Sequence, residues 1–231
     1  MRRAVHFKEA AALLDVSEMT VRRDVGENPD LFGLLGGHIV AAGDVDADVP
    51  YDLSHAADRH SQAKRQACGH AVSHIRTEET IFIDCGTTLA HLVDLIPADT
   101  SLTVVCYALN IAEKIARKPN LSLILIGGLY HRASASFSGS PGLGTLDHLG
   151  INTAFLSAAG IDTERGASCA HFHEAEIKRR VMSIARKNVL VADSSKIGKL
   201  RPAFFSGLAA FDAIITEDGD LTGVSGLRSQ V

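Results

Sequence analysis

Residues 80–90, Thr-Ile-Phe-Ile-Asp-Cys-Gly-Thr-Thr-Leu-Ala, change from a strand-like to a helix-like pattern within a few positions. The apolar run Ile81, Phe82 and Ile83 is short and bounded by polar residues, which is typical of a buried strand. From Leu89 onward apolar residues recur at intervals of three and four, the period of a helix with one buried face. The segment therefore predicts a strand, a short glycine-bearing loop and a helix.

The loop between this strand and helix carries Asp84, Gly86, Thr87 and Thr88. In an α/β sheet such a loop lies at the carboxyl end of its strand, where ligands collect, and it directs the free N–H groups of the next helix toward them. The four residues therefore form a candidate cradle for an anionic group on a polar small molecule. The simpler alternative is that Gly86 only permits the turn and that Thr87 or Thr88 only caps the helix.

Further apolar runs predict the rest of a sheet. They cover residues 102–106, 121–126, 153–156, 189–192 and 213–215. Helical patterns alternate with them at residues 59–75, 110–117, 143–149 and 174–187. Because the apolar runs are continuous, both faces of each strand should be covered. The prediction is an α/β fold with a mainly parallel sheet covered by helices.

The composition is that of a globular protein. The chain has 231 residues, of which 46% are hydrophobic and 22% charged, enough for one sizeable domain and a small one. No apolar run approaches the roughly 20 residues of a membrane-spanning helix, and no signal peptide opens the chain. We therefore expect a cytoplasmic protein. The formal net charge of −4 means that any DNA binding must use a local basic patch.

The cysteines and histidines do not predict a metal site. Cys68, Cys85, Cys106 and Cys169 are widely spaced and lack the close pairing of zinc or redox motifs, so we expect buried thiols. His171 and His173 lie two apart beside Cys169, but no further ligand pair has suitable spacing. We expect neither a metal nor a cofactor.

The N-terminal segment predicts two short helices joined by a turn. The first ends at Leu14 and turns Ala10, Leu13 and Leu14 inward. Ser17 stands where an N-cap would open a second helix over residues 17–25. This arrangement is typical of a helix-turn-helix, and an ordinary helical hairpin is the alternative.

The second helix of this pair has a polar, partly cationic face. Our candidates for DNA contact are Ser17, Thr20, Arg22 and Arg23. Hydroxyl and guanidinium groups reach base edges and phosphates when a helix lies in a major groove. The alternative is an arginine pair that serves only solubility.

Several motifs together resemble the DeoR family of sugar-operon repressors. Residues 16–24 resemble its recognition helix, residues 34–37 its wing and residues 84–88 the loop of its effector domain. Further matches, in the same order, are Gly127-Gly128, residues 160–162 with Gly166, residues 174–179 and residues 193–198. The resemblance covers nearly the whole chain. It implies a transcriptional repressor with a winged helix-turn-helix and a sensor domain similar to ribose-5-phosphate isomerase, responding to a phosphorylated sugar.

We expect three parts along the chain. These are a partial winged helix-turn-helix at residues 1–40, a linker at residues 41–55 and a sugar-phosphate-sensing α/β domain at residues 56–231. The linker prediction rests on Gly43, Pro50 and alternating aspartates without a helical period.

The N-terminal end departs from the family pattern in two ways. Residues 1–6 precede the first predicted helix, where the family has another helix that completes a three-helix core. The alternatives are an internal start within a longer reading frame and a degraded DNA-binding module. Residues 26–58 contain seven acidic residues and no Lys or Arg, a composition that repels phosphate. DNA binding would then rest on Arg2, Arg3, Lys8, Arg22 and Arg23.

The loops after the predicted strands supply the candidate effector site. Because the carboxyl ends of parallel strands share one edge, these loops should converge. The candidate residues are Asp84, Gly86, Thr87, Thr88, Gly128, Asp162 and Lys196. The first loop's N–H and hydroxyl groups would bind a phosphate, the lysine would add charge, and the aspartates would accept hydroxyl hydrogen bonds. Taken singly, each also has a simpler structural explanation, such as a turn or a solvated side chain.

Two further details concern this site. The family tends to carry Thr-Asn where this chain has Cys106-Tyr107, and the bulkier pair would change which sugar fits. Glu174 and Lys178 begin a predicted helix, where an acid suits the positive end of the dipole and the two side chains would form an i,i+4 pair.

Three functions are compatible with these motifs. The first is a repressor whose partners are operator DNA, a phosphorylated sugar and further copies of itself in a dimer or tetramer. The second is a sugar-phosphate isomerase with Asp162, Glu174 or Glu176 as proton shuttle, which leaves the helix-turn-helix unexplained. The third is a sugar-phosphate binder that has lost DNA binding. We expect the first function and no enzymatic activity.

Overall fold

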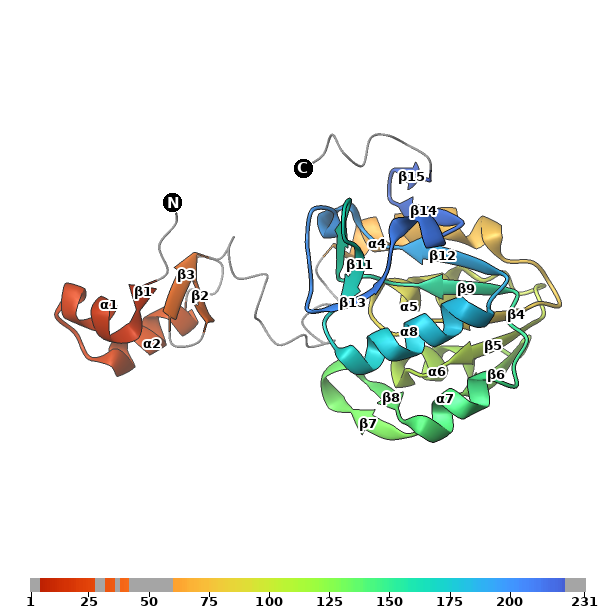
Figure 1. Cartoon of the computed structure of the whole chain (residues 1–231), viewed down its shortest axis with the longest axis horizontal. Coiled ribbons are helices and arrows are strands. Elements are labelled where there is room, and N and C mark those ends of the chain that lie inside the picture. The colour runs from red at the N-terminus through yellow and green to blue at the C-terminus, as the bar shows by residue number, and fades with distance from the viewer. Residues whose placement is uncertain (1–4, 28–31, 36–37, 42–59, 223–231) are drawn as a thin grey trace. The chain divides into compact units, whose positions relative to one another are not determined.

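The computed structural model describes residues 5–27, 32–35, 38–41 and 60–222. The chain forms two compact units, Met1–Pro50 and Tyr51–Val231, which Figure 1 colours from red to orange and from light orange to blue. Most of the predicted linker, residues 42–55, lies outside the described residues.

The N-terminal unit combines two helices with a small antiparallel sheet. Its elements are β1 (Val5–His6), α1 (Phe7–Leu14), α2 (Glu18–Glu27), β2 (Phe32–Leu35) and β3 (His38–Ala41). Strand β3 lies between β1 and β2 and pairs antiparallel with both. The predicted N-cap is confirmed, because the Ser17 hydroxyl accepts a hydrogen bond from the Thr20 N–H at 3.0 Å. The unit thus has a helix-turn-helix followed by a hairpin.

The small core of this unit differs from the prediction at the end of α1. It consists of Ala10, Ala11, Val21 and Val25, with Ile39 packed against them. Leu13 and Leu14, expected to face inward, are 73% and 67% exposed, so that prediction is wrong. They are the last two residues of α1, and no described element of this unit covers them.

The C-terminal unit is built on a seven-stranded sheet in the order β15-β14-β12-β9-β4-β5-β6. Neighbouring strands are parallel except for β15 at one edge, which runs antiparallel to β14. The strands are β4 (Thr80–Ile83), β5 (Leu102–Cys106), β6 (Leu121–Leu125), β9 (Thr153–Leu156), β12 (Lys187–Val191), β14 (Ala213–Thr216) and β15 (Gly219–Asp220). The predicted α/β fold with a mainly parallel sheet is confirmed.

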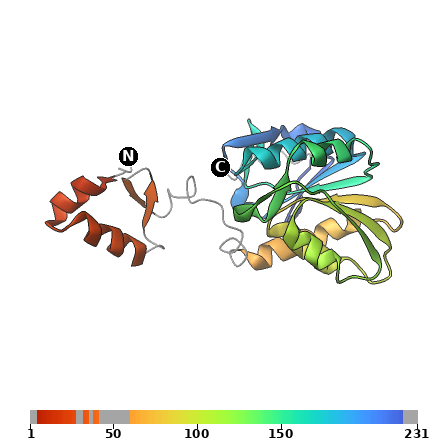
Figure 2. The ribbon, with the colours of Figure 1, turned by 90° about the horizontal axis from the view of Figure 1, so that it is seen from below.

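Helices cover both faces of this sheet. They are α4 (Ser61–Ala71), α5 (Thr88–Leu95), α6 (Leu109–Ile115), α7 (Ser140–Leu146) and α8 (Phe172–Ile184). Figure 2 shows α4, α5 and α6 on one face and α7 and α8 on the other. Ile81, Phe82 and Ile83 of β4 are accordingly fully buried. None of the helices in the described part of the chain combines the length and apolarity needed to cross a membrane.

Two small antiparallel sheets were not predicted. One pairs β7 (Leu129–His131) with β8 (Ser136–Ser138), and the other contains β10 (Gly160–Asp162), β11 (Gly166–Cys169) and β13 (Ala203–Ser206). These strands have three or four residues each, too few to show a period in the sequence. Strands β7 and β10 begin just past the ends of β6 and β9, so both small sheets extend from the carboxyl edge. Short 3-10 helices complete the unit at η2 (Val72–His74), η3 (Arg132–Ser134), η4 (Ser194–Lys196) and η5 (Leu208–Ala210).

The glycine pair before β7 allows a direct stability test. Gly128 has a φ of +143°, and a Cβ atom there would lie 2.1 Å from the Ser138 carbonyl oxygen. A Cβ atom on Gly127 would meet nothing within 4 Å among the described residues. Gly128→Ala should lower the free energy of unfolding by roughly 1–3 kcal/mol, because the β7–β8 hairpin must move. Gly127→Ala should change it by less than about 1 kcal/mol. Urea denaturation of both variants measures this, and equal stabilities would contradict the assignment.

Candidate functional site

Three central strands and one helix meet at the carboxylate of Asp84, the residue after β4. Tyr107, after β5, donates its hydroxyl proton to Oδ1 at 2.7 Å. Ser157, after β9, donates both its N–H and its hydroxyl to Oδ2 at 2.8 Å. Lys178 of α8 forms an ion pair with the same carboxylate, and both charged side chains are buried. Asp84 therefore anchors the carboxyl edge of the sheet.

The sequence predicted different partners for these charged groups. Lys178 forms its ion pair with Asp84 across the fold, and its charge also opposes the rise in the pKa of Glu174, the predicted i,i+4 partner. Burial, the largest influence, would lower the pKa of Lys178. Asp84, Cys85, Cys169 and Glu174 together outweigh it and raise the pKa, so the lysine stays charged. Both oxygens of Asp84 have partners inside the protein. Its contact with a sugar hydroxyl stays a prediction, and such a contact would have to share or displace one of these partners.

The next residues of the loop carry the predicted cradle. Gly86 has a φ of 102°, a conformation that favours glycine, and its carbonyl accepts a hydrogen bond from the Asn110 side chain at 3.2 Å. Thr87 occupies the N-cap position of α5 but makes no side-chain cap. Its hydroxyl instead accepts a hydrogen bond from Lys64 Nζ at 2.9 Å. Thr88, the first residue of α5, is buried.

Lys64 was missed by the sequence reasoning. It lies on α4 and is only 3% exposed, because it shares the inward face of the helix with Ala67, Cys68 and Ala71. The three- and four-residue spacing of that face was the signal that predicts its burial. A lysine beside the N-terminus of α5 adds positive charge where helix N–H groups already favour anions.

The other predicted effector residues lie on neighbouring loops. Asp162 Oδ1 accepts the N–H groups of Glu164 and Arg165 at 3.0 and 2.7 Å, which holds a turn. Lys196 Nζ lies 3.9 Å from the Asp193 carboxylate. A β-bridge between Ile161 and Ile197 brings these two loops together. Gly128 allows the close approach of β7 to β8 described above. The bridge ties the loops of Asp162 and Lys196 to each other, and none of the contacts just described involves residues 84–88.

Glu174 is the most perturbed acid at this edge. It is only 5% exposed, and burial, the largest influence, raises its pKa to about 7, with Asp84 adding to the rise. Lys178, the Cys85 thiol and the Ser134 hydroxyl oppose the rise. A carboxyl group in this state changes its protonation near neutral pH.

Three histidine rings stack at the start of α8. The rings of His131 and His173 stack with centroids 3.7 Å apart, and those of His171 and His173 are 5.2 Å apart. Burial, followed by the two neighbouring rings, lowers the pKa of His173 to about 4. Within the described residues, no group of three or more His, Cys, Asp or Glu side chains is placed to hold a metal ion. The four cysteines are buried free thiols, as predicted.

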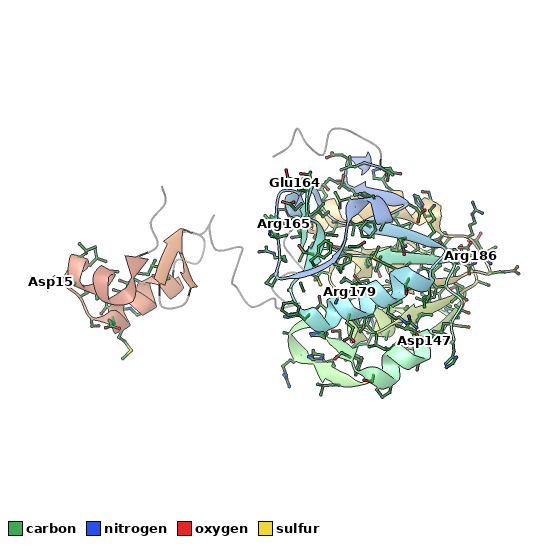
Figure 3. All side chains as sticks on the ribbon, viewed as in Figure 1. Asp15, Asp147, Glu164, Arg165, Arg179 and Arg186 are labelled. Atoms are coloured by element: carbon green, nitrogen blue, oxygen red, sulfur yellow. The ribbon has the colours of Figure 1, made fainter. Side chains whose placement is uncertain are left out.

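A shallow hollow lies elsewhere, between α7 and α8. Its lining includes Leu143, Asp147, Glu176 and Arg179, and Figure 3 labels Arg179 on α8 and Asp147 just after α7. None of the predicted effector residues lines it. Glu176 is exposed, whereas Glu174 two positions earlier is buried, so this hollow and the Asp84 cluster use different faces of α8.

The candidate DNA contacts lie at the start of α2. Ser17 and Arg23 are exposed and Thr20 is half-buried, while Val21 and Val25 face the core as predicted. The Ser17 hydroxyl also lies 2.8 Å from the Thr20 hydroxyl. The side chain of Arg22 lies outside the described residues. DNA contact by these side chains stays a prediction.

Comparisons with known proteins agree with this architecture. The DeoR C terminal sensor domain matches residues 59–218, and the DeoR-like helix-turn-helix domain matches residues 1–28. The chain belongs to the DeoR family. It is therefore a DNA-binding transcriptional repressor with a sensor domain, which confirms the predicted functional class.

The relatives of this DeoR-family chain include named regulators. It is 38% identical over 213 residues to the deoxyribose operon repressor of Escherichia coli strain K12, covering 92% of this chain and 84% of that protein. It is 30% identical over 215 residues to the HTH-type transcriptional regulator IolR of Bacillus subtilis strain 168, with the same coverage of 92% and 84%.

Solved structures resemble this chain at low sequence identity. The eIF2B delta structure from Chaetomium thermophilum matches with a TM-score of 0.51 and 14% identity, over 69% of this chain and 57% of that one. Ribose 5 phosphate isomerase A from Neisseria gonorrhoeae matches with a TM-score of 0.44 and 18% identity, over 58% and 52%.

The buried ion pair predicts a large loss of stability when one partner is removed. Lys178→Met leaves Asp84 buried without its counter-charge and should lower the free energy of unfolding by roughly 3–5 kcal/mol. Lys114, which forms an exposed ion pair with Asp94 at 2.7 Å, is the matched control, and Lys114→Met should cost less than about 1 kcal/mol. Adding Asp84→Asn to Lys178→Met should recover part of the loss. Similar small losses in both methionine variants would contradict the role given to the buried pair.

The raised pKa of Glu174 predicts a pH-dependent stability. Between about pH 4.5, the ordinary pKa of the group, and about pH 7, the folded state keeps a proton that the unfolded state has lost. This group's contribution to stability should therefore fall as pH rises through that window. Glu174→Gln should become more stable relative to wild type by roughly 2–4 kcal/mol between pH 4 and pH 8. Glu176→Gln, an exposed control, should show no such change. A stability difference for Glu174→Gln that is the same at every pH would contradict the assignment.

Proposed function

We propose that the C-terminal unit binds a phosphorylated sugar at residues 84–88 and that this binding controls the affinity of the chain for operator DNA. The observation that carries the proposal is the hydrogen bond from buried Lys64 to Thr87 at the N-terminus of α5. A cation, a hydroxyl group and helix N–H groups at one loop are what a phosphate group requires. In this proposal Gly86, Thr87 and Thr88 hold the phosphate, with Lys64 supplying the charge.

The remaining predicted residues take supporting roles in the proposed site. Asp162, Lys196 and Gly128 belong to loops that follow other strands and would complete its rim. Asp84 would position the loop through its contacts with Tyr107, Ser157 and Lys178, and its predicted contact with a sugar hydroxyl would add to this role.

The output of the proposed switch is DNA binding by α2. Residues 1–40 would bind the operator through Ser17, Thr20, Arg22 and Arg23, with residues 41–55 as the linker and residues 56–231 as the sensor. Ser17 would contribute mainly through its cap. A homo-oligomer, either a dimer or a tetramer, would present two such helices to successive turns of the DNA. Effector binding would shift the populations of DNA-competent and incompetent arrangements.

The first effector to test is a phosphorylated deoxyribose. The E. coli relative is named a deoxyribose operon repressor and is 38% identical over 92% of this chain. That name supports a five-carbon sugar phosphate over larger candidates.

We propose binding without turnover. Lys178 and Asp84 neutralise each other, Asp162 holds a turn and Glu176 is exposed, which leaves Glu174 as the remaining candidate for the proton shuttle of an isomerase. Only one candidate carboxyl group remains, and the named relatives are regulators. Both points support a sensor rather than an isomerase. A coupled assay with ribose 5-phosphate should detect no isomerisation.

A gel-shift titration tests the proposed function. Wild-type protein should shift DNA from its own upstream region, and deoxyribose 5-phosphate should reverse the shift. Lys64→Met should keep its DNA affinity but need roughly 10–100-fold more effector, because one charged contact to the phosphate is lost. Arg65→Met, which changes the exposed neighbouring residue on α4, is the matched control and should respond like wild type.

Two outcomes of this titration would contradict the proposal, one for the position of the phosphate and the other for the class of ligand. A wild-type response in Lys64→Met would show that the phosphate binds elsewhere. A wild-type protein that shifts its DNA but responds to no sugar phosphate would show that the unit senses another class of ligand.

A further inference from the structure

Two buried polar atoms at the start of α8 lack hydrogen-bond partners among the described residues. They are Glu174 Oε1 and His173 Nε2. An unpaired buried polar group typically costs about 1–3 kcal/mol, so native proteins rarely keep one without a use. A ligand that forms hydrogen bonds with Glu174 Oε1 and His173 Nε2 would remove this cost.

These atoms lie at the same edge as the proposed phosphate loop. After burial, the charges of Glu174 and Asp84 are the next causes that raise the pKa of Cys85, and Cys85 directly precedes Gly86. The neighbouring Cys85 thiol and Ser134 hydroxyl both oppose the rise in the pKa of the Glu174 carboxyl. Glu174 therefore adjoins the loop that would hold a phosphate, with one oxygen left unpaired.

Stacking with two other histidine rings holds the His173 ring, and with it Nε2, in place. The ring of His173 lies against those of His131 and His171, and His131 Nε2 lies 2.7 Å from the Ser138 hydroxyl of β8. The stacking of the His131 ring on the His173 ring therefore joins the β7–β8 hairpin to the start of α8. The His173 ring thus has a set orientation and keeps Nε2 available for a hydrogen bond.

The charges at this end differ from those at the phosphate loop. Lys178, the cation of the cluster, is paired with Asp84. The remaining groups are an acid and an imidazole, which suit hydroxyl groups, since each can exchange a hydrogen bond with an alcohol. Above pH 7, where Glu174 is ionised, a second anionic group of a ligand would be repelled by it.

We propose that Glu174 and His173 recognise the hydroxyl groups on the uncharged carbon chain of the effector, at the end opposite its phosphate. The site then selects sugar or polyol monophosphates and rejects sugar bisphosphates and phosphorylated sugar acids. This inference rests on the proposed function, because it takes residues 86–88 and Lys64 as the phosphate end.

Calorimetric titration of the full-length protein with deoxyribose 5-phosphate and with inorganic phosphate separates the two ends. Glu174→Leu removes the carboxyl group, and His173→Phe keeps an aromatic ring for stacking but removes Nε2. Each should weaken binding of deoxyribose 5-phosphate at least about 10-fold while leaving inorganic phosphate unchanged, since one good hydrogen bond in a buried site is worth about a factor of ten. Lys64→Met should weaken both ligands. Glu176→Leu, on the exposed face of α8, should change neither.

A second comparison tests the predicted selectivity. Glu174→Gln keeps hydrogen-bonding groups without the charge, so it should retain deoxyribose 5-phosphate within about 3-fold and improve binding of 5-phosphoribonate, which carries a carboxylate at the other end. At pH 8, wild type should bind 5-phosphoribonate at least about 10-fold more weakly than deoxyribose 5-phosphate, because the ionised Glu174 opposes its carboxylate.

The outcomes distinguish this inference from the proposed function. Wild-type affinity for deoxyribose 5-phosphate in both Glu174→Leu and His173→Phe, together with loss in Lys64→Met, would overturn the inference and leave the phosphate site standing. Equal losses of both ligands in Glu174→Leu and His173→Phe would assign these residues a structural role and also overturn it. A wild-type protein that binds neither ligand would overturn the proposed function and this inference together.

Discussion

The buried ion pair between Asp84 and Lys178 organises the sensor unit. It joins β4 to α8 across 94 residues of sequence, and the hydrogen bonds from Tyr107 and Ser157 add the ends of β5 and β9 to the same carboxylate. Burying either charge alone would be strongly unfavourable, so each requires the other. The pair fixes where the strand ends and the first turns of α8 lie, and every other feature of the candidate site depends on those positions.

This anchor leaves two chemically different places at the carboxyl edge. One is the loop at residues 86–88, where the N-terminus of α5 and the buried Lys64 offer positive charge. The other is the start of α8, where Glu174 and His173 offer unpaired polar atoms without net positive charge. A molecule with a phosphate at one end and hydroxyl groups along an uncharged chain suits both places at once. Lys178 is paired with Asp84, so it adds no net positive charge for a phosphate at either place.

The sequence predicted the local parts of this arrangement and missed the long-range ones. The run at Ile81 to Ile83 and the glycine at position 86 were enough to place a strand, a loop and a helix. No spacing rule connects Asp84 to Lys178, so the partner of each could not be predicted. Lys64 was overlooked although it lies on the same helical face as Ala67, because a lysine is rarely buried. The helical period also predicted that Leu13 and Leu14 face inward. The period alone does not show whether another element covers that face of the helix.

A crystal structure of the full-length protein with deoxyribose 5-phosphate tests the central claim most directly. The account predicts phosphate oxygens within hydrogen-bond distance of the Thr87 and Thr88 N–H groups and of Lys64 Nζ, with the ion pair between Asp84 and Lys178 intact. A ligand seated in the hollow between α7 and α8, or a Lys178 that leaves Asp84 to bind the phosphate, would contradict it.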